Sequence, residues 1–235
     1  EVRVVKDEDV ETVAFFVLWA NIPANAETVD YATGLANNFS QALGVNNEQL
    51  LAFAAVIDKE SSGDKAESYA IGNVTMNFLK QGGSSSLKTL DDVTMFDNTF
   101  AQGATQSNFT AFKAKSAREQ NAKFALGAAI NALGLTKGIG GFGFSDATDG
   151  ADSWDGIDLV STKFSNAHRG YTWSAGSKDL VTQYKKERNG GVDVSKWTFS
   201  DKGAQISAKS IIGKTLYTDI LTGRGEYKQD TTRFK

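Results

Sequence analysis

Apolar residues recur at helical spacing through much of the 235-residue chain, and this periodicity limits the fold more than any other feature. Intervals of three and four residues place such side chains on one face of an α-helix. The spacing predicts six helices, at residues 9–20, 27–43, 46–60, 64–80, 111–133 and 176–188. Short aromatic and threonine-rich runs, such as GYTW and KWTFS, predict a few short strands. We therefore expect a mainly α fold of the α+β class.

Breaks in the pattern set the expected ends of these helices. Pro23 separates the first two helices, because its ring cannot continue a helix. The run QGGSSS at residues 81–86 has the composition of a loop, and Gly134 suits the end of the helix at 111–133.

Composition excludes several kinds of site. The chain has no cysteine and one histidine, His168, which rules out disulfides, thiolate metal sites and a histidine-rich metal site. The net charge of −3 provides no basic field for nucleic acid. The apolar run at residues 13–20 is too short to cross a membrane. We expect no metal and no cofactor. The glycines at residues 138–143 match the dinucleotide-binding pattern G-x-G-x-x-G, but they follow a predicted helix instead of a strand, so the structural context of that pattern is missing.

The predicted helix at 46–60 ends its apolar face on an acid. Leu50, Phe53, Ile57 and Glu60 are spaced three, four and three residues apart, so all four share one face. Desolvation at the rim of a core, together with the helix C-terminus, would raise the pKa of Glu60 and suit it to act as a general acid. The alternative is that Glu60 bends outward at a frayed helix end and meets water.

Three short segments in order resemble the cell wall hydrolases of the spore-cortex-lytic type, which are lysozyme-like enzymes that cleave peptidoglycan. The first is Glu60-Ser61-Ser62-Gly63, which matches the family's helix-ending Glu followed closely by Gly. The second, residues 70–77, matches a helix with the pattern A-x-x-x-V-x-x-N. The third, residues 146–151, is similar to the family's D-P-T-x-G-A groove segment. Phe78 and Ala147 depart from the family's Arg and Pro.

The resemblance implies a lysozyme-like helical domain that cleaves the β-1,4 bond between N-acetylmuramic acid and N-acetylglucosamine, with Glu60 as the general acid/base. The resemblance covers residues 46–160, which we expect to be the catalytic domain. We expect an N-terminal helical segment packed on the core at 1–45 and a C-terminal extension of the same domain at 161–235, for which the family offers no counterpart. Hydrolysis needs a second carboxylate, whereas a lytic transglycosylase can use one acid twice. The resemblance favours the one-acid route, and both routes stay open.

The resemblance and the acid-rich loop together suggest residues that bind the glycan. These are Asn77, Thr148, Asp149, Gly150, Asp152 and Trp154, and four aspartates are candidates for a second carboxylate: Asp149, Asp152, Asp155 and Asp158. Each has a structural alternative. Asp-Gly pairs favour tight turns, Asn77 can bond to neighbouring backbone, and Trp154 can belong to the core. An irregular calcium site in this loop is a further alternative.

These expectations describe an enzyme whose partner is the peptidoglycan strand and which works outside the cytoplasm, as a secreted, periplasmic or particle-borne protein. An immunity or delivery partner is compatible with that role, and the residues identify none. The rival hypothesis is a non-catalytic glycan-binding or assembly protein that keeps the lysozyme-like fold.

Overall fold

The described part of the chain forms two compact units. The structure is a computed structural model that describes residues 43–95, 100–101, 103–114, 120–137, 145–164 and 170–222. Unit 1 contains the described residues up to Met76 and those from Thr89 to Asp146. Unit 2 contains Asn77–Lys88 and the described residues from Ala147 onward.

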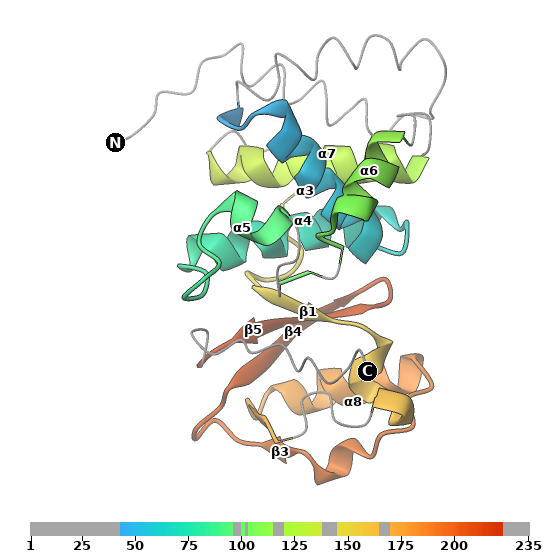
Figure 1. Cartoon of the computed structure of the whole chain (residues 1–235). Helices are drawn as coiled ribbons and strands as arrows, with labels where there is room; N and C mark the ends of the chain where they lie inside the picture. The colour runs from blue at the N-terminus through green and yellow to red at the C-terminus, as the bar shows by residue number, and fades with distance from the viewer. Residues whose placement is uncertain are drawn as a thin grey trace. The chain divides into compact units, whose positions relative to one another are not determined.

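Unit 1 is helical and is built around α3 (Asn47–Glu60). This helix packs against α5 (Leu90–Thr94), α6 (Gln106–Ala114) and α7 (Gln120–Thr136) (Figure 1). The predicted apolar face is the buried one, because Leu50, Phe53 and Ile57 have no exposed surface. The core of unit 1 therefore lies where the sequence periodicity places it.

The first part of α4 (Lys65–Lys80) also belongs to unit 1 and lies close to α7. A Cβ atom added to Gly72 would lie 3.0 Å from the backbone oxygen of Ala128 and 3.4 Å from the Ala132 side chain. Small residues on both helices allow this close approach, because a larger side chain at residue 72 would push the backbones apart.

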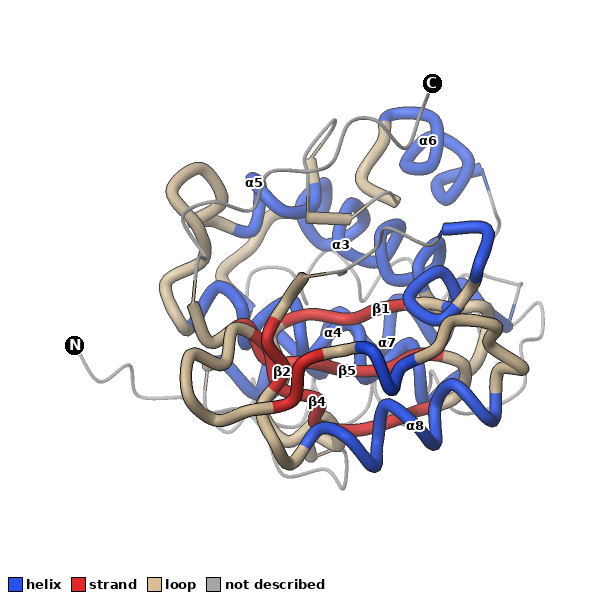
Figure 2. Tube along the Cα trace, turned by 90° about the horizontal axis from the view of Figure 1, so that it is seen from below, coloured by secondary structure: helices blue, strands red, loops and turns tan. Residues whose placement is uncertain are grey.

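Unit 2 is built on a five-stranded sheet with the order β1-β5-β4-β2-β3. The strands are β1 (Ser153–Asp155), β2 (Thr172–Trp173), β3 (Thr198–Phe199), β4 (Ile206–Ile212) and β5 (Thr215–Ile220). Pairs β1–β5 and β5–β4 are antiparallel, whereas β4–β2 and β2–β3 are parallel. Helix α8 (Ser177–Glu187) runs along this sheet and contacts β4 (Figure 2). Three 3-10 helices occupy the loops: η1 (Ile157–Val160), η2 (Thr162–Phe164) and η3 (Val194–Lys196).

The hairpin of β4 and β5 contains a bulge. Ala208 pairs with Thr218 and Ser210 pairs with Tyr217, so Lys209 is one extra residue in β4. The core of unit 2 lies between the sheet and α8, and it takes apolar side chains from β4 on both sides of the bulge. Its fully or almost fully buried members are Leu159, Val160, Trp173, Val181, Tyr184, Val194, Ile206 and Leu216.

Several predicted elements are confirmed and others are wrong. The helices expected at 46–60, 64–80 and 176–188 are α3, α4 and α8, and residues 81–86 form no helix or strand. Of the single helix expected at 111–133, the structure describes the end of α6, up to Ala114, and α7 from Gln120; residues 115–119 lie outside the described residues. Gly134 does not end that helix, since α7 continues to Thr136. The helices expected at 9–20 and 27–43 lie outside the described residues except for Leu43, as do Pro23, His168 and the glycines at 138–143.

The described residues thus form both helices and a sheet, which agrees with the expected α+β class. The three functional ranges expected from the sequence remain predictions. Residues 147–160 were expected in the catalytic range, and they lie in unit 2, where β1 pairs with β5. In the described part of the chain, no helix is both long and apolar enough to cross a membrane.

Candidate functional site

The candidate acid, Glu60, is the last residue of a well-defined helix. Asn46 caps the start of α3: its side chain accepts from the Gln49 N–H at 2.8 Å, and the Gln49 side chain accepts from the Asn46 N–H at 2.9 Å. At the other end, the Ser61 N–H donates to the Ile57 carbonyl at 2.9 Å. Both ends of the helix are therefore held by hydrogen bonds, which fixes the point where Glu60 leaves it.

The Glu60 side chain is half-buried and is held by a backbone donor. Its Oε1 atom accepts from the Gly103 N–H at 2.5 Å. Gly103 is itself anchored, because its carbonyl accepts from Asn108 Nδ2 at 3.1 Å and from the Thr105 N–H at 2.9 Å. A Cβ atom on Gly103 would lie 3.0 Å from Lys59 Cβ and 3.1 Å from Glu60 Oε1. A side chain at residue 103 would therefore crowd both Lys59 and Glu60, so Gly103 helps to position the acid.

The turn after Glu60 contains a second acid that the spacing argument missed. Glu67 is 1% exposed, and the Ser62 hydroxyl donates to its Oε2 atom. Its own N–H donates to Asp64 Oδ1 at 2.9 Å, so Asp64 caps the start of α4. The sequence signal was the capping pattern Asp64-x-x-Glu67, which marks a helix start and does not by itself indicate burial. Nearby, the Ser68 hydroxyl donates to Ser61 Oγ at 2.9 Å.

A buried lysine in α7 was also missed. Lys123 has no exposed surface, and burial lowers the pKa of its ammonium group. The first turn of α7 lies beside the turn that follows α3, because a Cβ atom on Gly63 would come within 2.6 Å of Asn121 Nδ2. Glu67 and Lys123 are thus charged side chains buried among the described helices of unit 1.

The second family-like segment, residues 70–77, lies on α4 and crosses from unit 1 into unit 2 after Met76. Asn73 is 4% exposed, and among the described residues its Oδ1 atom has no hydrogen-bond partner. Asn77 is the first residue of unit 2, and its Nδ2 donates to the Ala151 carbonyl at 3.0 Å. This bond goes to backbone 74 residues away, instead of to the neighbouring backbone that the structural alternative for Asn77 expected.

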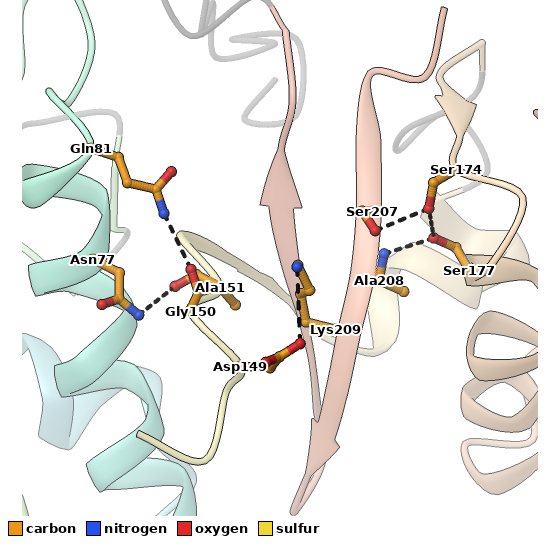
Figure 3. Close-up of polar contacts among 10 residues, drawn as sticks. All are labelled: Asn77, Gln81, Asp149, Gly150, Ala151, Ser174, Ser177, Ser207, Ala208 and Lys209. Atoms are coloured by element: carbon orange, nitrogen blue, oxygen red, sulfur yellow. Dashed lines mark hydrogen bonds and ion pairs between the residues drawn. The ribbon is translucent and has the colours of Figure 1, made fainter. Parts of the chain in front are cut away.

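The third family-like segment forms a tight turn in unit 2 (Figure 3). Asp149 and Gly150 have φ angles of 57° and 74°, and the Ala151 N–H donates to the Thr148 carbonyl at 3.3 Å. Left-handed backbone at both central residues is typical of a type I′ turn, which favours Asp-Gly. Gln81 Nε2 donates to the Gly150 carbonyl at 3.2 Å, and Lys209 Nζ lies 4.0 Å from Asp149 Oδ2. The turn-forming alternative for this Asp-Gly pair is confirmed.

The other predicted glycan-binding residues differ in their exposure. Thr148 and Asp152 have no exposed surface, and Asp152 Oδ1 accepts from the Ile220 N–H at 2.8 Å. Trp154 is half-buried in β1 opposite Tyr217. Among the candidate second carboxylates, Asp155 is 8% exposed and Asp149 is open to solvent. Unit 2 thus gathers Asn77 with residues 148–154, and it presents Asp149 and Gly150 most openly.

A serine cluster in unit 2 joins α8 to the sheet (Figure 3). Ser174 Oγ lies 2.7 Å from Ser177 Oγ and donates to Ser207 Oγ at 2.9 Å. The buried Ser177 Oγ accepts from the Ala208 N–H at 2.8 Å. These hydroxyls are bonded to one another and to backbone, so we assign them a structural role.

No family model, curated protein or solved structure matches this chain. Within the described ranges, no group of three or more His, Cys, Asp or Glu side chains is placed to hold one metal ion. What the geometry offers chemically is therefore a positioned carboxyl group at the end of α3, beside a turn with an exposed hydroxyl and a buried second acid.

Proposed function

We propose that this protein is a peptidoglycan glycosidase of lysozyme-like fold that cleaves the bond between N-acetylmuramic acid and N-acetylglucosamine. The observation that carries the proposal is the position of Glu60. It ends the buried face of α3, is half-buried, and is oriented by the Gly103 N–H at 2.5 Å. The three segments that resemble cell wall hydrolases support the same residue. Such an enzyme would work outside the cytoplasm, where peptidoglycan is found.

In this proposal, Glu60 gives its proton to the glycosidic oxygen as that oxygen leaves and positive charge develops on the sugar ring. A positioned acid of this kind contributes about 10²–10⁴-fold to the rate. The contact with Gly103 matters because an oriented carboxyl group loses less freedom when the substrate binds. The sugar is then attacked either by water, which gives a hydrolase, or by the 6-hydroxyl of the muramic acid, which gives a lytic transglycosylase.

The test uses purified peptidoglycan and three proteins: the wild type, Glu60→Gln, and Glu48→Gln as a matched control. Glu48 is an exposed acid in the first turn of the same helix. We expect wild type and Glu48→Gln to release muropeptides at similar rates, and Glu60→Gln to be at least about 100-fold slower. Fragments are identified by mass. Equal release by wild type and Glu60→Gln would refute the assignment of Glu60.

One set of observations favours the second candidate, a non-catalytic glycan-binding or assembly protein. Thr148 and Asp152 are fully buried, and Asn77 donates to the Ala151 carbonyl, so these side chains support a turn and a strand. If wild type and Glu60→Gln sedimented equally with insoluble peptidoglycan, and neither released fragments, the non-catalytic candidate would be established in place of the enzyme.

A further inference from the structure

The turn between α3 and α4 links an exposed hydroxyl to a buried carboxylate. Ser62 lies at the apex of this turn, where the Gly63 N–H donates to the Ser61 carbonyl, and its side chain is exposed. The Ser62 hydroxyl donates to Oε2 of Glu67, which is 1% exposed. The hydroxyl proton is thus directed toward the buried carboxylate, from a residue that is itself exposed.

Helix capping alone does not account for this pair. Glu67 is the third residue of α4. The helix dipole stabilises an acidic side chain at this position even when the side chain is exposed to solvent. Here the carboxylate is instead buried, which is costly for a charged group. Its partner Ser62 lies outside the helix, and the cap itself is supplied by Asp64. The hydrogen bond thus joins an exposed residue of the turn to a carboxylate that is 1% exposed.

The pair is also next to the proposed acid. Ser62 follows Glu60 by two residues, so their Cα atoms are at most about 7 Å apart. In an inverting glycosidase, the attacking water lies between the general acid and the group that accepts a proton from the water. When both groups are carboxylates, they are about 6.5–9.5 Å apart. A hydroxyl that relays to a buried acid can serve as that acceptor from the surface of the turn.

We propose that Ser62, backed by Glu67, activates the attacking water, so that the enzyme hydrolyses its substrate. This inference rests on the proposed function. The water oxygen bonds to the anomeric carbon while one of its protons passes to Ser62 Oγ and the Ser62 proton passes to Glu67. The glycosidic bond breaks, and its oxygen takes the proton of Glu60. Solvent water then returns the proton from Glu67 to Glu60. Ser62 is the catalytic residue of this pair, and Glu67 is a positioning residue that acts through it.

The test compares wild type, Ser62→Ala and Glu67→Gln on purified peptidoglycan in water labelled with oxygen-18. Gln keeps an acceptor for the Ser62 hydroxyl and removes the proton acceptor. We expect wild type to give reducing ends that carry the label, and both variants to lower kcat for this product about 100-fold with KM changed less than about threefold. The share of anhydro-muropeptides should rise in both. Ser62→Ala changes an exposed residue of the turn and leaves the Glu67 side chain in place, so it decides the result if Glu67→Gln does not fold.

Ser68→Ala is the matched control, because its hydroxyl is also bonded within this turn but is 1% exposed. We expect its product ratio and kcat to equal those of wild type within about twofold. Unchanged hydrolysis in Ser62→Ala, or wild type that forms only anhydro products, would overturn the water-activating role while Glu60 remains the proposed acid. Wild type that releases no fragments would instead overturn the proposed function and this inference together.

Discussion

At the scale of single residues, the candidate site depends on contacts that side-chain spacing only partly predicts. The positions of Glu60 and of its buried face follow from helical periodicity, since intervals of three and four residues leave one face for the core. Periodicity does not predict the donor to Glu60, because Gly103 lies 43 residues away and donates through its backbone amide. Glu67 was missed for a related reason: a capping pattern predicts a helix start, and burial depends on the surrounding helices.

Replacing Gly103 with alanine tests how the acid is held. The new methyl group would lie 3.1 Å from Glu60 Oε1, so the chain must shift and the hydrogen bond must lengthen. We expect the free energy of unfolding to fall by about 1–3 kcal/mol, measured by urea denaturation. The control is Gly176→Ala, where a Cβ atom meets nothing within 4 Å and where we expect a change within about 0.5 kcal/mol. Equal effects of the two changes would contradict the close contact.

Lys123 gives a prediction about pH. Burial lowers the pKa of Lys123 below 10.5, so the folded protein holds this proton less tightly than the unfolded chain does. The contribution of Lys123 to the free energy of unfolding is therefore smallest at neutral pH, and it increases as the pH rises toward 10.5. We expect the difference in unfolding free energy between wild type and Lys123→Met to move in favour of wild type between pH 7 and pH 10. A difference that stays constant over this range would show that Lys123 is not perturbed.

At the scale of elements, helices were easier to predict than strands. In α3, α4 and α8 the apolar face repeats with one period along the whole element. The hairpin of β4 and β5 was not predicted, because Lys209 interrupts the alternation within ISAKSII. Tertiary packing, which the sequence pattern does not contain, decides where such a bulge forms.

At the Asp149–Gly150 turn, the cost of backbone strain can be measured without a change in side-chain contacts. Gly150 has a φ angle of 74°, and a Cβ atom there would meet nothing within 4 Å. Gly150→Ala should therefore cost only the strain of left-handed backbone, about 1–2 kcal/mol in unfolding free energy. Asp149→Asn should change it by less than about 0.5 kcal/mol, since Asn tolerates this backbone and the ion pair to Lys209 is exposed. Thermal and urea unfolding of both variants would check this, and a larger loss in Asp149→Asn would contradict it.

Ser177 tests the attachment of α8 to the sheet. Its buried hydroxyl accepts from the Ala208 N–H at 2.8 Å, so Ser177→Ala leaves that donor without this acceptor. We expect a loss of about 1–3 kcal/mol in the free energy of unfolding, measured with denaturant. Thr182→Ala, at an exposed position of the same helix, is the comparison and should lie within about 0.5 kcal/mol of wild type. If both variants matched wild type, the hydroxyl would have no structural role.

At the scale of the whole molecule, the described residues form two units, and helix α4 has residues in each. The core of unit 1 surrounds α3, the core of unit 2 lies between α8 and the sheet, and α4 contributes to both units. The sequence did not indicate this division, because no linker or change of composition marks Met76 or Asp146. A division inside a helix follows from which contacts each turn makes in the folded chain.

Separate cores should respond separately to cavities. Ile57→Ala in unit 1 and Leu216→Ala in unit 2 each remove a fully buried side chain, at a cost of about 2–5 kcal/mol. We expect hydrogen exchange to speed up mainly in α3 and α7 for the first variant, and mainly in β4 and β5 for the second. Equal loss of protection in both units from either change would show that they unfold as one body.

The bulge in β4 has a consequence for the length of this strand. Ile206, Ala208 and Ile211 all reach the same core, although two residues, Lys209 and Ser210, lie between the last two. Omitting Lys209 leaves a plain two-residue alternation in which those three side chains keep their faces. Omitting Ser210 would have the same effect, because one residue would again lie between Ala208 and Ile211. Losing Ile206, Ser207 or Ala208 would instead shift the residues before the bulge relative to those after it. The bulge is thus the part of β4 where the chain can lose a residue and keep its hydrophobic pattern in phase.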